Sequence, residues 1–236
     1  MGSRRGIASD ADLRELEEIL GHRFARPKLL EHALTHGSIA DKTQQTYERL
    51  EFLGDRVLGL VVADLLFHRF TREAEGALGK RFAALVSRTC LSEVAVNLGL
   101  GRFLRLSPGE SESGGRENPS LLADACEAVI AALYLDGGLD AARRFIEPIW
   151  TPLLEASPRP PQDPKTALQE WAQGRQLELP NYEVIDQSGP DHAPNFLVRV
   201  AVTGHEPETG EGKSKRMAER AAADRLLDRL RAQGIA

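Results

Sequence analysis

Cysteine is scarce in this chain of 236 residues, and so are the long apolar stretches of membrane and secreted proteins. Two cysteines, Cys90 and Cys126, are too few for a disulfide framework and favour a reducing compartment. No apolar run reaches the ~20 residues of a membrane helix, and the start, MGSRRGIASDADL, lacks the apolar core of a secretory signal. We therefore expect a cytoplasmic protein with no membrane partner.

An excess of basic residues is missing as well. The chain has 30 Lys and Arg against 35 Asp and Glu, a formal net charge of -5, whereas nucleic-acid-binding domains are usually basic. The total charge alone therefore argues against a nucleic-acid partner. With 42% hydrophobic and 28% charged residues, the composition is that of a globular protein and excludes disorder, collagen and coiled coils for most of the chain.

A proline-rich stretch, SPRPPQDP at 157–164, divides the chain. Prolines at this density cannot continue a helix and favour an extended spacer. Residues 1–156 show helical periodicity and no sustained alternation, which predicts an all-α domain. Residues 165–236 predict a small α+β domain of order α-β-β-β-α. The expected helices of the first domain cover 10–20, 27–34, 47–70, 80–98, 120–135 and 139–150; those of the second cover 164–176 and 214–232, with strands near 182–189, 196–202 and 205–214.

Acidic residues interrupt two helices that are otherwise apolar. In ERLEFLGDRVLGLVVADLLF, the side chains of Glu48, Glu51 and Asp55 fall within about 60° of one another on the helical wheel. The rest of this wheel is apolar nearly all round, which is typical of a buried helix. In SLLADACEAVIAALYL, Asp124 and Glu127 are neighbours at i,i+3. Like charges on buried helices repel one another and are costly to desolvate, so a compensating group is needed.

A divalent cation would compensate these five carboxylates. Hard carboxylate oxygens without a histidine or thiol cluster suit Mg²⁺, with Mn²⁺ as a plausible substitute, rather than Zn²⁺. The plainer alternative is that the acids start helices or pair with bases such as Arg49 and Arg56. If metal is bound, phosphoryl transfer is the leading reaction, because two divalent ions can clamp the attacking and leaving oxygens.

Five stretches of the chain resemble known families. ERLEFLGDRVLGL and LRLSPGESESGGRENPSLLADACEAVIAALYLDGGL are similar to the ribonuclease III family. PKTALQEW, GPDH and GKSKRMAERAAA resemble a double-stranded-RNA-binding domain, and together the match covers nearly the whole chain in the bacterial order. The resemblance implies a homodimeric, Mg²⁺-dependent endoribonuclease that cuts double-stranded RNA to 5′-phosphate and 3′-hydroxyl ends. It also implies work on ribosomal RNA precursors and structured messenger RNA.

The resemblance also assigns roles to residues of the nuclease domain. Glu51, Asp55, Asp124 and Glu127 would hold the metal, with Asp55 and Glu127 most important for cleavage. Among the remaining matches, Glu48 and Glu75 would be supporting acids, and Phe52 would lie at the dimer interface. The chain departs from the family pattern at Tyr47, where Asn is frequent, and at Gly37, where Arg is common.

The residues matched to RNA contacts lie in the second domain. Such a domain spans ~16 bp and reads 2′-hydroxyls and phosphates of the duplex rather than base sequence. Within 213–220, four bases face one acid, Glu219, although the domain as a whole is not basic. The expected RNA contacts are Thr166, Gln169, Glu170, His192, Lys213, Lys215 and Arg216.

Two other functions are alternatives to the predicted endoribonuclease. A non-catalytic double-stranded-RNA-binding protein could use a nuclease-like domain only to dimerise, but it would be expected to lose the acids, and here every acidic position is filled. A metal-dependent phosphohydrolase of small nucleotides would leave the second domain without a role. Duplex RNA cleavage that requires Mg²⁺ separates all three.

Overall fold

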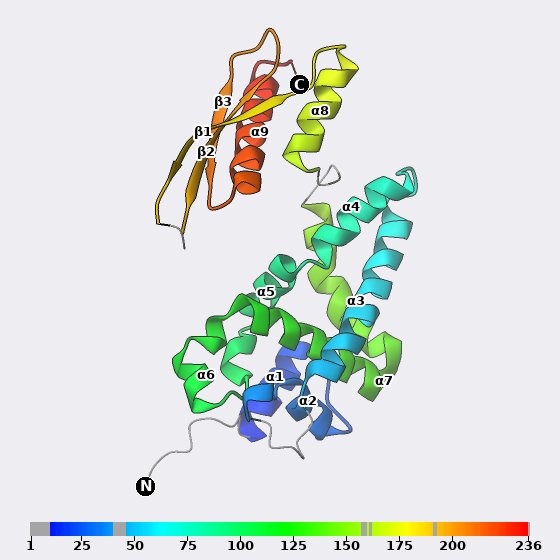
Figure 1. The fold of residues 1–236 in the computed structure, drawn as a ribbon. Helices are drawn as coiled ribbons and strands as arrows, with labels where there is room; N and C mark the ends of the chain where they lie inside the picture. Colours follow the sequence, from blue (N-terminus) through cyan, green and yellow to red (C-terminus); the bar gives the residue numbers. More distant parts are fainter. Residues whose placement is uncertain (1–9, 40–45, 157–159, 161, 191–192, 236) are drawn as a thin grey trace. The chain divides into compact units, whose positions relative to one another are not determined.

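The computed structural model describes residues 10–39, 46–156, 160, 162–190 and 193–235 (Figure 1). The chain divides into two compact units, residues 1–161 and 162–236. In its described part the first unit is built from helices joined by turns, with one isolated β-bridge between Thr35 and Arg105, so the predicted all-α class is confirmed. Its helices are α1 (Asp10–Leu20), α2 (Pro27–Ala33), α3 (Glu48–Arg69), α4 (Glu75–Leu85), α5 (Arg88–Asn97), α6 (Pro108–Glu112) and α7 (Pro119–Glu155), with 3-10 turns at Gly37–Ile39, Leu100–Phe103 and Gly115–Glu117.

The pairing of α3 with α7 forms the centre of the first unit (Figure 1). Apolar side chains of both helices, among them Val61, Val62 and Val129, are fully buried in the same core. The two backbones come close at Gly54, where an added Cβ would lie 1.8 Å from the carbonyl oxygen of Glu127. Only a residue without a side chain allows this approach, so Gly54 sets the distance between the two acid-bearing helices.

Two helix boundaries differ from the prediction. The single helix expected over 80–98 is wrong: α4 ends at Leu85 and α5 starts at Arg88. Ser87 causes the break, because its hydroxyl accepts the Cys90 N–H at 3.2 Å and so starts a new helix. In α7, Gly138 has φ 72° and ψ -172°, which kinks the helix where an end was expected, and the segment beyond the kink continues past Pro148 to Glu155.

One side of α3 is exposed, contrary to the prediction of a helix buried all round. The exposed fractions of Phe52, Leu60 and Phe67 are 65%, 56% and 68%. These positions are eight and seven residues apart, so they lie along one stripe of the helix. Hydropathy shows that a face of a helix is apolar but not whether other parts of the chain cover it, which explains the error.

The second unit has the expected α-β-β-β-α order, which confirms its fold class. Its elements are α8 (Pro164–Gly174), β1 (Asn181–Ser188), β2 (Asn195–Ala201), β3 (Glu208–Gly212) and α9 (Lys215–Ala232). The strands form an antiparallel sheet in the order β1-β2-β3. Buried Leu168 of α8, Val200 of β2 and Leu226 of α9 share one core, and Gly210 lets β3 approach α9, since a Cβ there would lie 2.1 Å from the Ala222 nitrogen.

The scarce features of the sequence have simple structural counterparts. Both cysteines are free thiols, with Cys90 partly exposed and Cys126 buried in the core. Burial raises the pKa of the Cys126 thiol, which keeps it protonated and unreactive. Across the described ranges, every helix is too short or too polar to traverse a bilayer.

Candidate active site

Acids of α3 and α7 meet where Gly54 brings the two helices together. Glu51 lies in the first turn of α3, one turn before Asp55, while Asp124 and Glu127 lie one turn apart on α7. Carboxylate oxygens of Glu51, Asp124 and Glu127 lie within 4.8 Å of one another, and all three side chains are half-buried. We call these three residues the acid trio.

Burial and mutual repulsion make the charged forms of the acid trio unfavourable. Burial, followed by the charges of Asp55, Glu51 and Asp124, raises the pKa of Glu127 to about 8. Burial also raises the pKa of Glu51 and that of Asp124, and the Asp124 charge adds to the shift at Glu51. A divalent cation would remove this penalty, because it favours the deprotonated carboxylates. The trio therefore fits a site for a hard divalent ion.

Two arginines accompany the acids. Arg56 donates to its sequence neighbour Asp55 and lies over the Phe52 ring, 4.5 Å from the centroid. Arg88, the first residue of α5, places Nη1 3.3 Å from Asp124 Oδ1. Arg88 could not be found from sequence patterns, because it lies on a different helix, far along the chain from Asp124.

The two supporting acids occupy different places. Glu48 begins α3 and accepts a hydrogen bond from the Thr46 hydroxyl. A Cβ at position 37 would lie 2.8 Å from Glu48 Oε1, so Gly37 gives Glu48 its room. Glu75 begins α4, beyond the far end of the 22-residue α3, and a helix of that length spans ~33 Å. Within one chain, the structure does not bring Glu75 to the acid trio.

Tyr47 packs beside the acids and was not expected to matter there. It is 3% exposed, directly precedes α3 and lies 5.6 Å from His36 between ring centroids. Burial, followed by the charges of Asp124 and Glu51, raises the pKa of Tyr47, so the phenol stays neutral. Tyr47, where the resembled pattern often has Asn, is therefore an uncharged aromatic side chain near the acids.

The raised pKa of Glu127 predicts how stability depends on pH when metal is absent. The pKa of Glu127 rises from 4.5 when exposed to about 8 in the folded protein. Protonated Glu127 therefore favours the folded state at low pH, and this contribution to the free energy of unfolding is lost as pH rises from about 4.5 to about 8. Solvent screens this half-buried group, and we expect Glu127→Gln to raise the free energy of unfolding at pH 8 by ~1–2 kcal/mol. Urea unfolding in EDTA at pH 5 and pH 8 measures this. Glu18→Gln, at an exposed acid of α1, is the control; equal changes in both variants would contradict the expectation.

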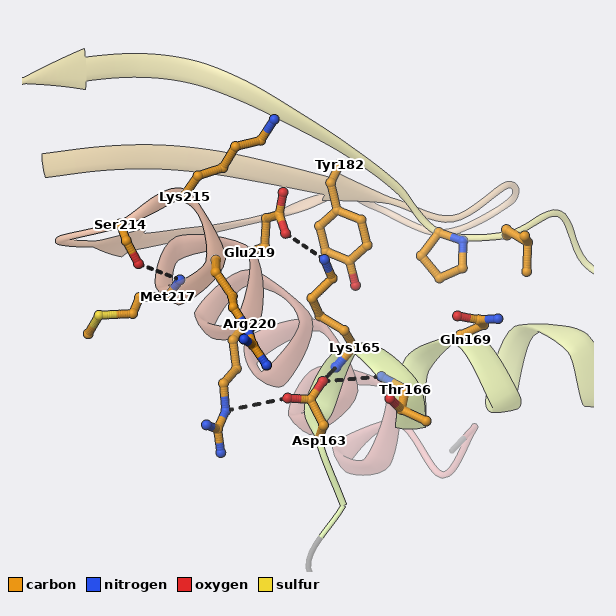
Figure 2. A pocket seen from close by; sticks show the side chains of 13 residues that line it. Asp163, Lys165, Thr166, Gln169, Tyr182, Ser214, Lys215, Met217, Glu219 and Arg220 are labelled. Carbon is orange, nitrogen blue, oxygen red and sulfur yellow. Dashed lines mark hydrogen bonds and ion pairs between the residues drawn. The ribbon is translucent and has the colours of Figure 1, made fainter. Parts of the chain in front are cut away.

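The second unit carries an open groove of about 1030 Å³ between α8, the start of α9 and the Tyr182 region (Figure 2). Some of the polar side chains that line the groove are paired with other side chains of the protein. Lys165 Nζ lies 2.5 Å from Glu219 Oε2 and 4.6 Å from the Tyr182 ring centroid. Burial raises the pKa of Tyr182 to about 12, so its phenol is neutral. Lys165 therefore builds the groove wall rather than offering a free charge.

Four of the residues expected to contact RNA line this groove, namely Thr166, Gln169, Lys215 and Arg216. Thr166 is held at the start of α8, where Asp163 accepts its N–H at 3.4 Å. At the start of α9, Ser214 accepts the Met217 N–H, leaving neighbouring amides directed outward.

Of the other three expected RNA contacts, Glu170 and Lys213 do not line the groove. Glu170 is outside the groove lining and accepts a hydrogen bond from Gln162 at 2.5 Å. Lys213 is exposed and precedes Ser214, the residue that caps α9. His192 lies outside the described residues.

Comparison with known proteins agrees with this architecture. Residues 26–153 match the family described as Ribonuclease-III-like, and residues 164–230 match the double-stranded RNA binding motif. The chain is 52% identical to Ribonuclease 3 of Caulobacter vibrioides over 218 residues, covering 91% of this chain and 94% of the relative. It is 49% identical to Ribonuclease 3 of Rhodobacter capsulatus over 220 residues, covering 93% and 96%.

A solved structure extends the comparison to three dimensions. The nuclease domain of ribonuclease III from Campylobacter jejuni, described as flexible in a region involved in dimer formation, has a TM-score of 0.55 and 44% identity. It matches 61% of this chain and 96% of that domain. The helical unit with its acids, the RNA-binding unit and relatives of nearly full length all agree. The chain therefore belongs to the ribonuclease III family of endoribonucleases, which cut double-stranded RNA.

Proposed function

We propose that this endoribonuclease is Mg²⁺-dependent and that Glu51, Asp55, Asp124 and Glu127 hold the metal at its cleavage centre. The observation that carries the proposal is the acid trio, whose oxygens lie within 4.8 Å of one another. Asp55 is one helical turn from Glu51 and its charge contributes to the raised pKa of Glu127, so it lies near enough to join the site. The products would carry 5′-phosphate and 3′-hydroxyl ends.

The protein's own residues prepare this chemistry. Burial and the neighbouring carboxylates raise the pKa of Glu127 to about 8, so its charged form is the one that a bound cation would favour most strongly. Arg56 orients the Asp55 carboxylate through their hydrogen bond. A bound Mg²⁺ would supply positive charge to the attacking water and to the leaving 3′-oxygen. Buried Tyr47 limits solvent beside the acids.

A homodimer would provide one cleavage centre for each RNA strand. The exposed stripe of Phe52, Leu60 and Phe67 on α3 gives each chain an apolar face that a second copy could cover. A self-complementary contact about a twofold axis is the commonest way to bury such a face. The role of Phe52 is therefore proposed to be dimerisation.

The groove of the second unit would hold the duplex through phosphates and 2′-hydroxyls. Lys213, Lys215 and Arg216 stand at the N-terminus of α9, where the helix itself favours phosphate. Thr166 and Gln169, which line the same groove, would contact the minor groove of the duplex. Glu170 and His192 remain expected contacts from family resemblance.

Salt dependence tests the basic residues of α9. We expect the variant Lys215→Gln/Arg216→Gln to weaken duplex binding and to lower the slope of log Kd against log salt by ~2, because each lost phosphate contact releases ~1 fewer counterion. Titration of a labelled duplex at several salt concentrations measures the slope. The control is Arg231→Gln, in the last turn of the same helix. An unchanged slope in the double variant would exclude these contacts.

The cellular work we propose is maturation of ribosomal RNA precursors and processing of structured messenger RNA in the cytoplasm. This part rests on the family alone. Its test is the accumulation of uncut ribosomal precursor in cells that lack the protein. Normal precursor processing in such cells would argue against it.

The enzymatic proposal is tested with purified protein, a labelled RNA duplex, Mg²⁺ and EDTA. Cleavage with Mg²⁺ and none with EDTA is the expected result. Binding without cleavage under both conditions would favour a non-catalytic RNA-binding protein. Hydrolysis of small nucleotides with an intact duplex would favour a phosphohydrolase.

A further inference from the structure

Arg88 reaches the acid trio from a third helix. Its Nη1 lies 3.3 Å from Asp124 Oδ1, and the side chain of Asp124 is 18% exposed whereas that of Arg88 is 60% exposed. The carboxylate therefore faces the half-buried cluster, while most of the guanidinium remains open to solvent. One group of this pair belongs to the proposed metal site and the other stands at its solvent edge.

The fold holds the backbone of Arg88 in place while leaving its side chain free to turn. Ser87 fixes the start of α5 through two hydrogen bonds, accepting from the Cys90 N–H at 3.2 Å and donating to the Ala84 carbonyl at 2.7 Å. Beyond it, Leu91 and Val94 of α5 are buried in the core that α7 shares. Arg88 is thus anchored next to Asp124 at its Cα, with a long side chain that can take a second position.

The charge of Arg88 acts on the whole acid trio. It lowers the pKa of Glu51, of Asp124 and of Glu127, and so opposes the upward shift that burial causes in each. Arg56 differs, because its hydrogen bond is with Asp55, its neighbour in sequence. Arg88 therefore partly performs the neutralisation that a divalent cation would complete.

We propose that Arg88 is an exchangeable counter-ion: it pairs with Asp124 when no divalent cation is bound and turns to a phosphate of the RNA when a cation takes Asp124. Most of the Arg88 guanidinium is exposed to solvent, which screens its charge, so a cation can displace it from Asp124 at small cost. The released guanidinium is planar and permanently charged, which suits bidentate contact with phosphate. The inference rests on the proposed metal site.

Metal affinity without RNA gives the first test. We expect Arg88→Gln to lower the Kd for Mn²⁺, measured by calorimetry on the full chain, about threefold to fivefold, since a competing and repelling charge is gone. Arg88→Lys keeps the charge and should stay within about twofold of the unmodified protein. The matched control is Arg69→Gln, because Arg69 pairs with Glu155 at the same 3.3 Å and is 62% exposed.

Duplex cleavage at saturating Mg²⁺ gives the second test. Arg88→Gln should raise KM about fivefold, leave kcat within about twofold, and lower the slope of log KM against log salt by ~1, because one phosphate contact is lost. Both results together support the proposal. A Kd for Mn²⁺, or a KM and salt slope, equal to those of Arg69→Gln would overturn it. An unmodified protein that binds no Mn²⁺ would instead refute the metal site itself, and the inference with it.

Discussion

Glu127→Gln is expected to lower kcat for duplex cleavage on the order of 10³-fold, because loss of a metal-holding charge removes several kcal/mol of transition-state stabilisation. The substitution keeps the size of the side chain and removes its negative charge from the acid trio. Since the RNA groove belongs to the second unit, the Kd for the duplex should stay within about twofold of the unmodified value.

Single-turnover cleavage and a binding titration measure these two quantities. Asp55→Asn should behave in the same way, because Asp55 is proposed to share the site. Glu18→Gln, an exposed acid of α1 that pairs with Arg23, serves as the control and should cut normally. Normal cleavage by Glu127→Gln would show that the assigned carboxylates are wrong.

Gly54→Ala is expected to destabilise the nuclease unit by at least ~3 kcal/mol and to abolish cleavage. The new Cβ would lie 1.8 Å from the Glu127 carbonyl oxygen, and backbone cannot yield as a flexible side chain can. The helices α3 and α7 would have to separate, which pulls Glu51 away from Asp124 and Glu127. The measurements are urea unfolding and duplex cleavage.

Gly59→Ala gives the matched control on the same helix. A Cβ at Gly59 would lie 3.4 Å from the Phe82 ring, an ordinary contact, and alanine favours helix by up to ~1 kcal/mol. This variant should be as stable as the unmodified protein or more so, and it should cut RNA. Equal loss in both variants would show that helix propensity or general packing, rather than the crossing at Gly54, controls the site.

Much of the fold could be predicted because local patterns were strong. The helical periodicity of α3, the alternation along β2 and the proline-rich stretch each rely on neighbours in sequence. The break between α4 and α5 was missed because one hydroxyl, that of Ser87, decides it. The exposed stripe on α3 was missed because hydropathy says that a face is apolar and not what covers it.

The residues of the acid trio could be predicted from the sequence, but their contacts with other segments could not. Carboxylates on apolar helices mark Glu51, Asp124 and Glu127 as costly to bury, so a compensating group could be expected. The contact of Arg88 with Asp124 and the crowding of Gly37 against Glu48 depend on distant segments that no periodicity links. The separation of Glu75 from the trio likewise follows only from the length of α3.

The negative net charge of the chain does not describe the charge at its two candidate sites. The net charge of -5 includes acids that are strained by burial and mutual repulsion and that a cation would neutralise. The groove of the second unit is lined by Lys215, Arg216 and Arg220 at the start of α9. A negative chain can therefore belong to a family that binds a polyanion, because the local charges matter rather than their sum.

Diffraction from crystals soaked in Mn²⁺, recorded at the manganese absorption edge, tests the central claim most directly. The account predicts an anomalous peak ~2.0–2.3 Å from carboxylate oxygens of Glu51, Asp124 and Glu127, and its loss in Glu127→Gln. A peak elsewhere, or none beside these residues in a protein that cleaves duplex RNA, would contradict it.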